Sequence, residues 1–550
     1  MKHQEKQDAS PHSTSPISEL DEDALLRIFV INASVITTSG ELHPLDLTRH
    51  TSQVCRQWRQ LILGSPSIWG RLINLNQLSN KTNNWRNEVL YRTGQSLLVV
   101  SGYILSGQND IQLFFHHLLS NHWSRIRELD VSLSTDPLDS SLLDIFWNHP
   151  APNLERFSLK YHPSVGYTPP QVAEHLPLSL FAGKAPLLRS FHSRLLEFDH
   201  RASWIPQLRS VTLSHPLTVT DFSALLSRTP HLEDLTIECG TPEVVPPPPP
   251  PMYGQDNKII LPQLHSIQIE HSLKNTVSIL KQIVPALRCD LALTTFDFSQ
   301  GDVSMDDFAS LLPIVSRFAE SCFASTVVME LTIEIQSRIF TAFPWIFRDA
   351  RTPSRRRVTK PFSMQGEAKR SHPQFFIHII CHPRLPTGSP TLLLPMFSGC
   401  RLDTVTIFDL ILGTTCDLQP QDPDVCELIL ALKSVKELTT SHYGLKLLIT
   451  VSLDTAHTFP SLKILKLHYL AAATSEYPDT LLLFMSRRRD AGVPVVILDI
   501  SHRTAKRGMG FGFLDVVHGL KVVWGADNGK EYVCGSGTPE VLDRLIPKTV

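Results

Sequence analysis

A short apolar pattern recurs along most of this chain and limits what the chain can fold into. The pattern is apolar-x-x-apolar-x-apolar, and most gaps between its copies are roughly 20 to 35 residues, the length of one strand–turn–helix unit. Units of this length stack with parallel strands on one side and helices on the other. Weaker copies begin at Leu188 and Val435, and Leu97 to Val100 is a candidate opening strand. The clear copies are Ile126-Leu129-Val131, Leu154-Phe157-Leu159, Leu208-Val211-Leu213, Leu232-Leu235-Ile237, Leu264-Ile267-Ile269, Leu293-Phe296-Phe298, Val328-Leu331-Ile333, Leu402-Val405-Ile407, Leu462-Leu465-Leu467 and Val495-Leu498-Ile500.

Helix-like segments fill several of the gaps between these copies. They are residues 111–119, 221–228, 306–312, 425–432 and 480–487. The units resemble leucine-rich repeats of degenerate form, in which the Asn or Cys expected in each turn is mostly missing. With 550 residues the chain is too long for one ordinary core, so an elongated array or several domains are expected. We therefore predict an α/β fold with a repeat solenoid over residues 76–545.

Two stretches interrupt the predicted array, and we expect loop insertions at 240–256 and 336–401. The first contains the six-proline run Pro246–Pro251, which favours an exposed polyproline II spacer. Recruitment of a proline-reading domain is the alternative for this run. The second includes a candidate strand from Phe375 to Ile380, which is also compatible with one or two degraded repeats.

The second insertion also carries a basic cluster from Arg351 to Arg370. A solvated loop, a nuclear-import or acidic-partner patch, and direct nucleic-acid binding are the three interpretations of this cluster. Nucleic acid is disfavoured because Phe362 is the one aromatic residue there, which leaves little for bases to stack on. The formal net charge of -2 also gives the chain no global basic field.

The N-terminal 75 residues follow a different pattern. Residues 1–17 are expected to be a disordered tail, and residues 18–75 to form a small helical module. One helix should begin between Ser18 and Glu22, and helical periodicity resumes from Leu45 to Leu63 before Ser65-Pro66 ends it. These helices carry more large apolar groups than a small core needs, which suggests a partner surface. A plain cap that seals the first repeat is the alternative.

Three runs in this stretch carry a family pattern. They are Leu20, Glu22, Leu25, Leu26, Ile28 and Phe29, then Ser52-Gln53-Val54-Cys55-Arg56-Gln57-Trp58-Arg59, then Ser65-Pro66-Ser67-Ile68-Trp69. With this spacing the stretch resembles an F-box, in the variant common in mushroom-forming fungi. Asp21 stands where the family usually has Pro, and Ala24 stands where it usually has Ile.

The resemblance implies that this module docks on a Skp-type adaptor and so links the chain to a cullin ubiquitin ligase. Trp69 is expected to pack the module against the first repeat instead. Cys55 is expected to be a small buried packing residue. The residues expected to contact the adaptor are Leu20, Leu25, Leu26, Ile28, Phe29, Val54, Trp58 and Leu61.

The sequence shows no spacing typical of a catalytic, cofactor or metal site. The run Gly508-Met509-Gly510-Phe511-Gly512 lacks the context of a phosphate-binding loop and predicts a turn. Adjacent His116 and His117 would point in different directions on a helix and make a poor metal pair. The nine Cys are scattered without a C-x-x-C pair, which favours buried reduced thiols. No run approaches the ~18 apolar residues of a membrane span, and the polar start lacks a secretory signal.

The favoured hypothesis is a substrate-recognition subunit of a Skp–cullin–F-box ubiquitin ligase, cytoplasmic and/or nuclear, with an unidentified protein substrate held by the solenoid. It needs no cofactor and no catalytic residue, because it would act by raising the local concentration of cargo near a ubiquitin carrier. A repeat scaffold whose helical cap binds no ligase adaptor is the first alternative. An enzyme that uses the 336–401 insertion or the Gly508 loop is the second.

Overall fold

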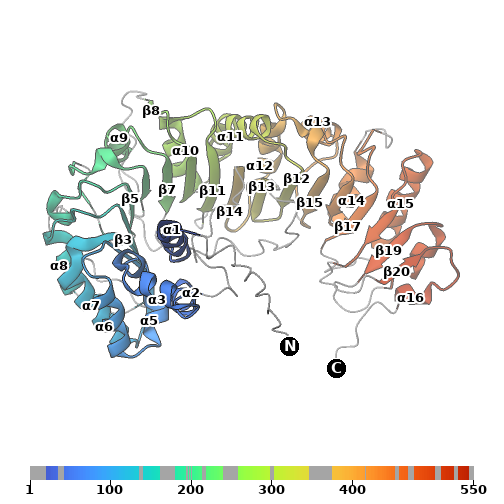
Figure 1. The fold of residues 1–550 in the computed structure, drawn as a ribbon. Helices are drawn as coiled ribbons and strands as arrows, with labels where there is room; N and C mark the ends of the chain where they lie inside the picture. The colour runs from blue at the N-terminus through green and yellow to red at the C-terminus, as the bar shows by residue number, and fades with distance from the viewer. Residues whose placement is uncertain are drawn as a thin grey trace, which may run out of the picture. The chain divides into compact units, whose positions relative to one another are not determined.

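The computed structural model of this chain divides into two compact units, Met1–Leu208 and Arg209–Val550, each of which is described by itself (Figure 1). The described residues are 20–34, 43–134, 140–161, 180–193, 196, 198–199, 201–213, 219–238, 258–297, 303–345, 375–414, 416–451, 457–468, 476–501, 510–524 and 530–543. The predicted tail at 1–17, the proline run Pro246–Pro251 and the basic cluster from Arg351 to Arg370 lie outside them.

The first unit opens with four short helices. They are α1 (Glu22–Asn32), α2 (Pro44–Thr51), α3 (Arg56–Leu63) and α4 (Pro66–Trp69). The first helix begins where the sequence predicted. The prediction of continuous helix from Leu45 to Leu63 is wrong, because α2 ends at Thr51 and Cys55 has the extended backbone of an N-cap, with φ -151° and ψ 170°.

A parallel sheet follows in the same unit, and its strands pair in sequence order. The strands are β1 (Ile73–Asn74), β2 (Leu98–Leu105), β3 (Ile126–Ser134), β4 (Arg156–Tyr161) and β5 (Ser190–Ser193). The connecting helices are α5 (Leu75–Ser79), α6 (Asn83–Arg92), α7 (Asn109–His122) and α8 (Ser140–Asn148), with 3-10 turns η2 (Trp123–Arg125), η3 (Leu180–Gly183) and η4 (Ile205–Gln207). The strands predicted from the apolar pattern are confirmed, although β1 precedes the predicted opening strand.

The apolar positions of the pattern form the core of this unit. Leu129 of β3 and Phe157 and Leu159 of β4 are fully buried, while the residues between them face the other side of the sheet. The Phe157 ring contacts that of Phe191 in the next strand, at a centroid distance of 5.7 Å. Parallel pairing in register therefore stacks the same pattern position in successive strands.

The second unit repeats this design with more strands. They are β6 (Ser210–Leu213), β7 (Asp234–Glu238), β8 (Ile259–Leu261), β9 (Ser266–His271), β10 (Ile283–Pro285), β11 (Asp290–Asp297), β12 (Glu330–Ile335), β13 (Ile339–Trp345), β14 (Phe375–Cys381), β15 (Ile407–Leu412), β16 (Glu437–Thr440), β17 (Ile464–Leu467), β18 (Ile497–Asp499), β19 (Lys521–Trp524) and β20 (Lys530–Val533). Its helices are α9 (Val219–Ser227), α10 (Leu273–Gln282), α11 (Met305–Ser325), α12 (Ser389–Leu393), α13 (Pro423–Ala431), α14 (His442–Thr450), α15 (Tyr477–Asp490) and α16 (Glu540–Asp543), with 3-10 turns η5 (Leu394–Phe397), η6 (Leu402–Thr404) and η7 (Gly512–Val516). Figure 1 shows α10, α11 and α13 along one side of the strands.

The sheet of this unit is mostly parallel but not ordered as the sequence predicted. From β11 the spatial order is β14, β13, β12 and then β15, and β13 is antiparallel to both of its neighbours. After β11, helix α11 connects to β12, which is not the neighbour of β11 in the sheet. Strands β13 and β14 then lie between β11 and β12, and β15 pairs with the other edge of β12. The loop insertion predicted at 336–401 therefore contains two strands of the main sheet, together with α12 and η5.

Two strands of this unit have a different register from the predicted one. In β11 the buried positions are Leu291 and Leu293, not Phe296, because Leu291 and Leu293 lie opposite Ile267 and Ile269 of β9. In β15 the buried residues are Phe408 and Leu410 instead of the predicted Ile407. Both segments contain several apolar residues, so the sequence fits the apolar pattern in more than one register. Pairing with the neighbouring strand selects one of these registers.

Candidate partner-binding site

Helix α1 is stable at its start because its N-terminus is capped. Asp21 is the N-cap, and its Oδ1 accepts a hydrogen bond from the Ala24 N–H at 2.6 Å. Glu22 and Asp23 add negative charge to the first turn, where the helix dipole favours it. The departure from the F-box pattern at Asp21 therefore supplies a working N-cap in place of the usual Pro.

The four helices share a small core. Leu25 and Phe29 form the buried face of α1, which contacts α2, α3 and α4. The Phe29 ring meets the Trp58 ring of α3 edge-on, with centroids 5.2 Å apart. Ile62 of α3 and Ile68 of α4 are fully buried as well. This packing fixes which side of α1 is left for a partner.

The eight residues predicted to contact the adaptor fall into three groups. Leu25 and Phe29 are 2% and 3% exposed, so they belong to the core of the module and not to its surface. The exposed members are Leu20, Ile28 and Val54. The half-buried members are Leu26, Trp58 and Leu61. Contact of any of these side chains with an adaptor stays a prediction.

Two exposed apolar residues of the module were not predicted. Ile31 is 63% exposed and lies three residues after Ile28, so the two are neighbours on one side of α1. Leu63, at the end of α3, is 38% exposed. Both residues are apolar and could have been noticed in the sequence. However, α1 is apolar on two sides, and periodicity alone does not say which side faces the core.

Trp69 joins the module to the first strand–helix units. The side chain is 2% exposed, and its Nε1–H donates a hydrogen bond to the Ile62 carbonyl at 2.8 Å. The Arg92 guanidinium of α6 lies 4.7 Å from the centre of the Trp69 ring. The Gly70 carbonyl accepts a hydrogen bond from the Val99 N–H of β2 at 2.7 Å. The prediction that Trp69 packs the module against the first repeat is confirmed.

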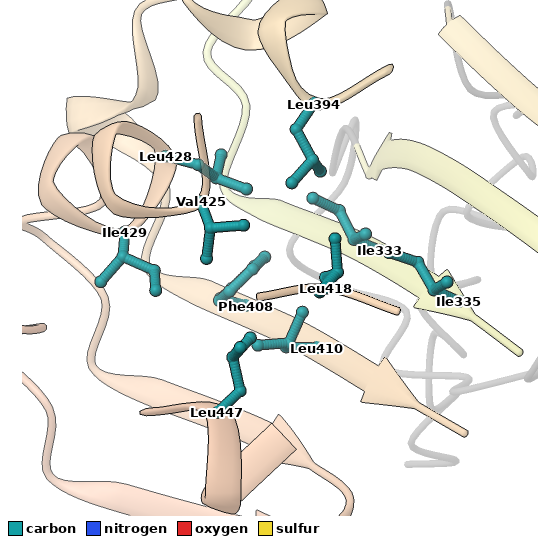
Figure 2. Close-up of a pocket in the computed structure, with 10 residues that line it drawn as sticks. All are labelled: Ile333, Ile335, Leu394, Phe408, Leu410, Leu418, Val425, Leu428, Ile429 and Leu447. Carbon is teal, nitrogen blue, oxygen red and sulfur yellow. The ribbon is translucent and has the colours of Figure 1, made fainter. Parts of the chain in front are cut away.

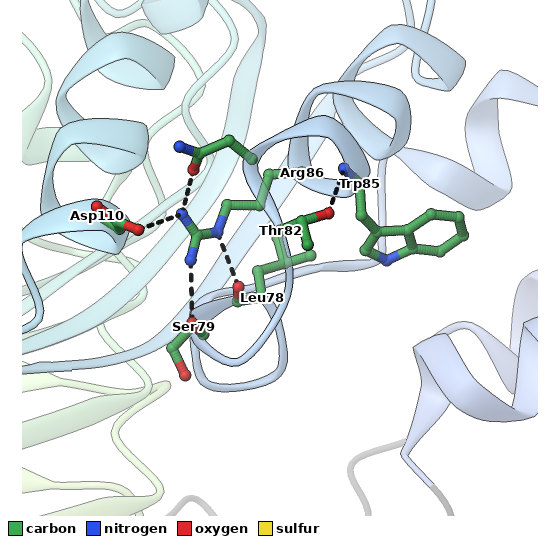
Figure 3. A network of polar contacts seen from close by, with 7 residues as sticks. Leu78, Ser79, Thr82, Trp85, Arg86 and Asp110 are labelled. Carbon is green, nitrogen blue, oxygen red and sulfur yellow. Dashed lines mark hydrogen bonds and ion pairs between the residues drawn. The ribbon is translucent and has the colours of Figure 1, made fainter.

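A buried arginine holds the next helices together (Figure 3). Arg86 of α6 is 3% exposed, and its guanidinium donates hydrogen bonds to the carbonyls of Leu78 at 2.9 Å and Ser79 at 3.0 Å. The same group donates to Asn83 Oδ1 and lies 4.0 Å from the exposed carboxylate of Asp110 on α7. The network fastens α5 to α6 and extends toward α7, which adds to the anchoring of the module by Trp69.

The described thiols differ in exposure, and Cys55 of the module is the exposed one among them. Cys289, Cys322, Cys381 and Cys534 are buried, and burial raises the pKa of Cys289 and of Cys322 to about 12. The prediction of a buried Cys55 is wrong. Cys55 is exposed, because it is the N-cap of α3 and its Sγ accepts a hydrogen bond from the Trp58 N–H at 3.5 Å.

A cavity between the sheet and helices of the second unit is built from apolar groups alone (Figure 2). It offers no polar group to orient a substrate. Its lining residues are Ile333, Ile335, Leu394, Phe408, Leu410, Leu418, Val425, Leu428, Ile429 and Leu447.

The remaining motifs show no constellation for chemistry in the part of the chain that the structure describes. No group of three or more His, Cys, Asp or Glu side chains there is arranged to hold a metal ion. Of the predicted glycine turn, Gly510 and Gly512 are described, and the Gly512 N–H donates to Asp543 Oδ1 at 2.8 Å. The negative charge of this carboxylate beside the turn would repel a phosphate, so the turn is a poor phosphate-binding site. Among the described helices, none has the length and apolar character needed to cross a membrane.

The fold and this site define an α/β protein in which a module of four helices is followed by a mostly parallel, repeat-like sheet. The sequence matches no protein-family model, and its comparison with curated proteins finds no match. Function therefore has to be argued from the exposed side of the module and from the faces of the sheet.

Proposed function

We propose that the chain is the substrate-recognition subunit of a Skp–cullin–F-box ubiquitin ligase. The observation that carries the proposal is the apolar surface of the N-terminal module. Ile28, Ile31 and Val54 are 40%, 63% and 64% exposed, although a small folded unit gains by burying such side chains. An F-box docks on its Skp-type adaptor through apolar side chains. The resemblance of this module to an F-box is our reason for assigning its exposed apolar side to such an adaptor.

The way in which the module is anchored suits catalysis by proximity. Trp69 and the Gly70 carbonyl fasten the module to α6 and β2 of the first unit, so no free linker separates it from the sheet that follows. A partner held by the module and a cargo held elsewhere on the chain would be attached to the same molecule. Attachment to one molecule raises the effective concentration of the cargo at a ubiquitin carrier brought by other subunits.

The double variant Ile28→Asp/Ile31→Asp tests the proposal by titration calorimetry of the full chain with a Skp-type adaptor. Loss of two apolar contacts of about 1.5–3 kcal/mol each predicts affinity weaker by at least ~100-fold. Both positions are exposed, so the variant should stay folded, with a melting temperature lowered only slightly by acidic side chains near the end of α1. Leu483→Asp is the matched control, because Leu483 is 43% exposed on α15 and should leave adaptor binding intact. A folded double variant that binds like the wild type would contradict the proposal.

A repeat scaffold whose module merely caps the sheet is the second candidate. The burial of Leu25 and Phe29 within the module favours it, as does the pairing of β1 with β2 directly after the module. A cap has no need for exposed apolar residues at 28 and 31. The scaffold hypothesis therefore predicts that the folded wild-type chain does not bind the adaptor at all.

A further inference from the structure

Three arginine side chains of the first unit gather near a single carboxylate. Glu128 lies on β3, and its Oε1 accepts a hydrogen bond from Arg127 Nη2 at 2.9 Å. Its Oε2 forms an ion pair with Arg156 Nη1 at 3.4 Å, because Glu128 and Arg156 lie opposite each other in the pairing of β3 with β4. The third arginine, Arg71, follows α4, and its Nη1 donates to Ser34 Oγ at 3.2 Å. These three arginines form an arginine cluster at the start of the sheet.

The positive charge of the arginine cluster is only partly balanced. Burial lowers the pKa of Arg71, and the nearby guanidinium of Arg127 lowers it further, while Glu128 opposes the shift. The Arg127 Nε–H is buried and donates to no acceptor among the described residues. The Arg156 side chain is 50% exposed, and Glu128 is the one carboxylate that pairs with it in the described part of the chain. Guanidinium groups that repel each other and keep unused donors gain free energy when an anion binds.

The neighbouring residues at this edge of the sheet do not remove the excess charge. The Glu155 N–H donates to the Arg127 carbonyl, and the Arg189 N–H donates to the Glu155 carbonyl, each at 2.8 Å. These hydrogen bonds place the three residues in a row at the start of β3, β4 and β5, with Glu155 between two arginines. Asp130, the next carboxylate on β3, lies opposite Ser158 and not opposite an arginine. The arginines therefore outnumber the carboxylates in this part of the sheet.

The geometry of the arginine cluster suits several separate carboxylates better than one phosphate group. Arg127 meets Oε1 of Glu128 and Arg156 meets Oε2, so this carboxylate lies between the two guanidinium groups. Their remaining N–H groups therefore do not converge on a single point. A carboxylate needs only one guanidinium, whose fork it can accept bidentately. Neighbouring strands lie roughly 5 Å apart and alternate residues of an extended segment roughly 7 Å apart, so successive acidic side chains can reach successive arginines.

We propose that the arginine cluster, made of Arg71, Arg127 and Arg156, binds an extended acidic segment of a partner protein in which Asp or Glu occupies alternate positions. Each carboxylate of the segment pairs with one guanidinium, and the side chains between them point away from the cluster. The proposal rests on contacts within the first unit. It goes beyond the proposed function, because neither the adaptor nor the ligase enters it.

Fluorescence anisotropy with the full chain tests the proposal. The probe is a short labelled peptide in which Glu alternates with Ser, and the control peptide carries Gln in place of Glu. The Glu peptide should bind, and its affinity should fall as salt is added, whereas the Gln peptide should not bind. The formal net charge of -2 gives the chain no general attraction for acidic peptides, so binding reports a local site.

Substitutions in the arginine cluster locate that site. Arg156→Gln, at an exposed position, should weaken binding of the Glu peptide about threefold. Arg127→Gln/Arg156→Gln should weaken it about tenfold, and Arg156→Lys, which keeps the charge, should weaken it less than Arg156→Gln does. Lys521→Gln is the matched control and should change nothing, because Lys521 is a cation on a strand of the second unit with its own carboxylate, Glu531, at 2.5 Å. Thermal denaturation checks that each variant is folded.

Equal affinity for the two peptides would overturn the proposal, as would wild-type affinity in the folded Arg156→Gln and Arg127→Gln/Arg156→Gln variants. An equal loss in Lys521→Gln would also overturn it, because the peptide would then respond to charge anywhere on the chain. Displacement of the Glu peptide by inorganic phosphate, beyond the effect of chloride at the same ionic strength, would instead show a site for one small anion. Self-association of the chain that Arg156→Gln abolishes would show a contact between copies and would likewise contradict the proposal.

Discussion

Arg488 illustrates how one buried cation can hold two segments of the second unit together. Its side chain is fully buried, and its guanidinium donates hydrogen bonds to the carbonyls of Thr458 at 2.8 Å and Phe459 at 3.0 Å. Burial lowers the pKa of Arg488 to about 10, so the group is still charged at pH 7. Its neighbours Arg487 and Arg489 are exposed in the last turn of α15, where cations complement the helix dipole, so the middle residue alone has this buried role.

Replacement of Arg488 by Met should therefore destabilise the chain strongly. Met keeps much of the apolar stem but leaves two buried carbonyls without their donors, which costs about 2–4 kcal/mol of unfolding free energy. Urea denaturation measures the loss. Arg489→Met changes the same residue type at an exposed position and should cost less than about 0.5 kcal/mol. Equal effects at the two sites would contradict a structural role for Arg488.

Gly70 is a second residue whose identity matters, because the backbone approaches it closely. A Cβ at Gly70 would clash with the Leu97 carbonyl oxygen and would lie 2.6 Å from Ser96 Oγ. The carbonyl belongs to the backbone before β2 and cannot simply rotate away. Gly70→Ala should lower the unfolding free energy by about 1–3 kcal/mol, measured by thermal denaturation. An unchanged melting temperature would show that the junction is looser than described.

Asp409 predicts a pH dependence of stability. Burial raises its pKa, so the folded state binds the proton more tightly than the unfolded state does. The unfolding free energy then falls as pH rises through the unfolded and then the folded pKa. Asp409→Asn should be more stable than the wild type at pH 7, and the difference should disappear below the unfolded pKa. Chemical denaturation across this range decides the point, and a difference that grows toward low pH would contradict it.

At the scale of elements, the apolar pattern located strands well but not their neighbours. The strands β3, β4, β6, β7, β9, β12, β17 and β18 lie where the pattern predicts them, because the spacing of core residues is a local property. The placement of β13 and β14 between β11 and β12 is not a local property. It depends on which strands pair with each other after the chain has passed through α11 to β12. The sequence also gave no hint that helix continues through Pro313 to Ser325.

Two substitutions at helix α11 should change the free energy of unfolding in opposite directions. Ser304 and Asp307 form a capping box, with the Ser304 N–H donating to Asp307 Oδ2 at 2.9 Å, so Ser304→Ala should cost about 1 kcal/mol. Pro313 is exposed inside the helix and has no N–H for the carbonyl of the preceding turn. Pro313→Ala should therefore stabilise the chain by about 1–2 kcal/mol. Thermal unfolding measures both, and destabilisation by Pro313→Ala would refute this account of the helix.

At the scale of the whole molecule, the sequence located the module, and the structure separated its surface from its core. Motif spacing placed the residues of α1 and α3, but burial divided them, so that Leu25 and Phe29 are core residues and Ile31 joins the exposed set. Exposure depends on how α1 packs against three other helices, which no local pattern encodes. The position of β13 and β14 in the sheet was equally beyond prediction, because it exists only after strands distant in sequence have paired.

The proposed function requires that this module binds a Skp-type ubiquitin-ligase adaptor. The most direct measurement is size-exclusion chromatography with light scattering of the purified full chain mixed with the adaptor. We expect a stable complex containing one copy of each, which the Ile28→Asp/Ile31→Asp variant should fail to form while remaining folded. A folded wild-type chain that elutes apart from the adaptor would contradict the claim and favour the scaffold.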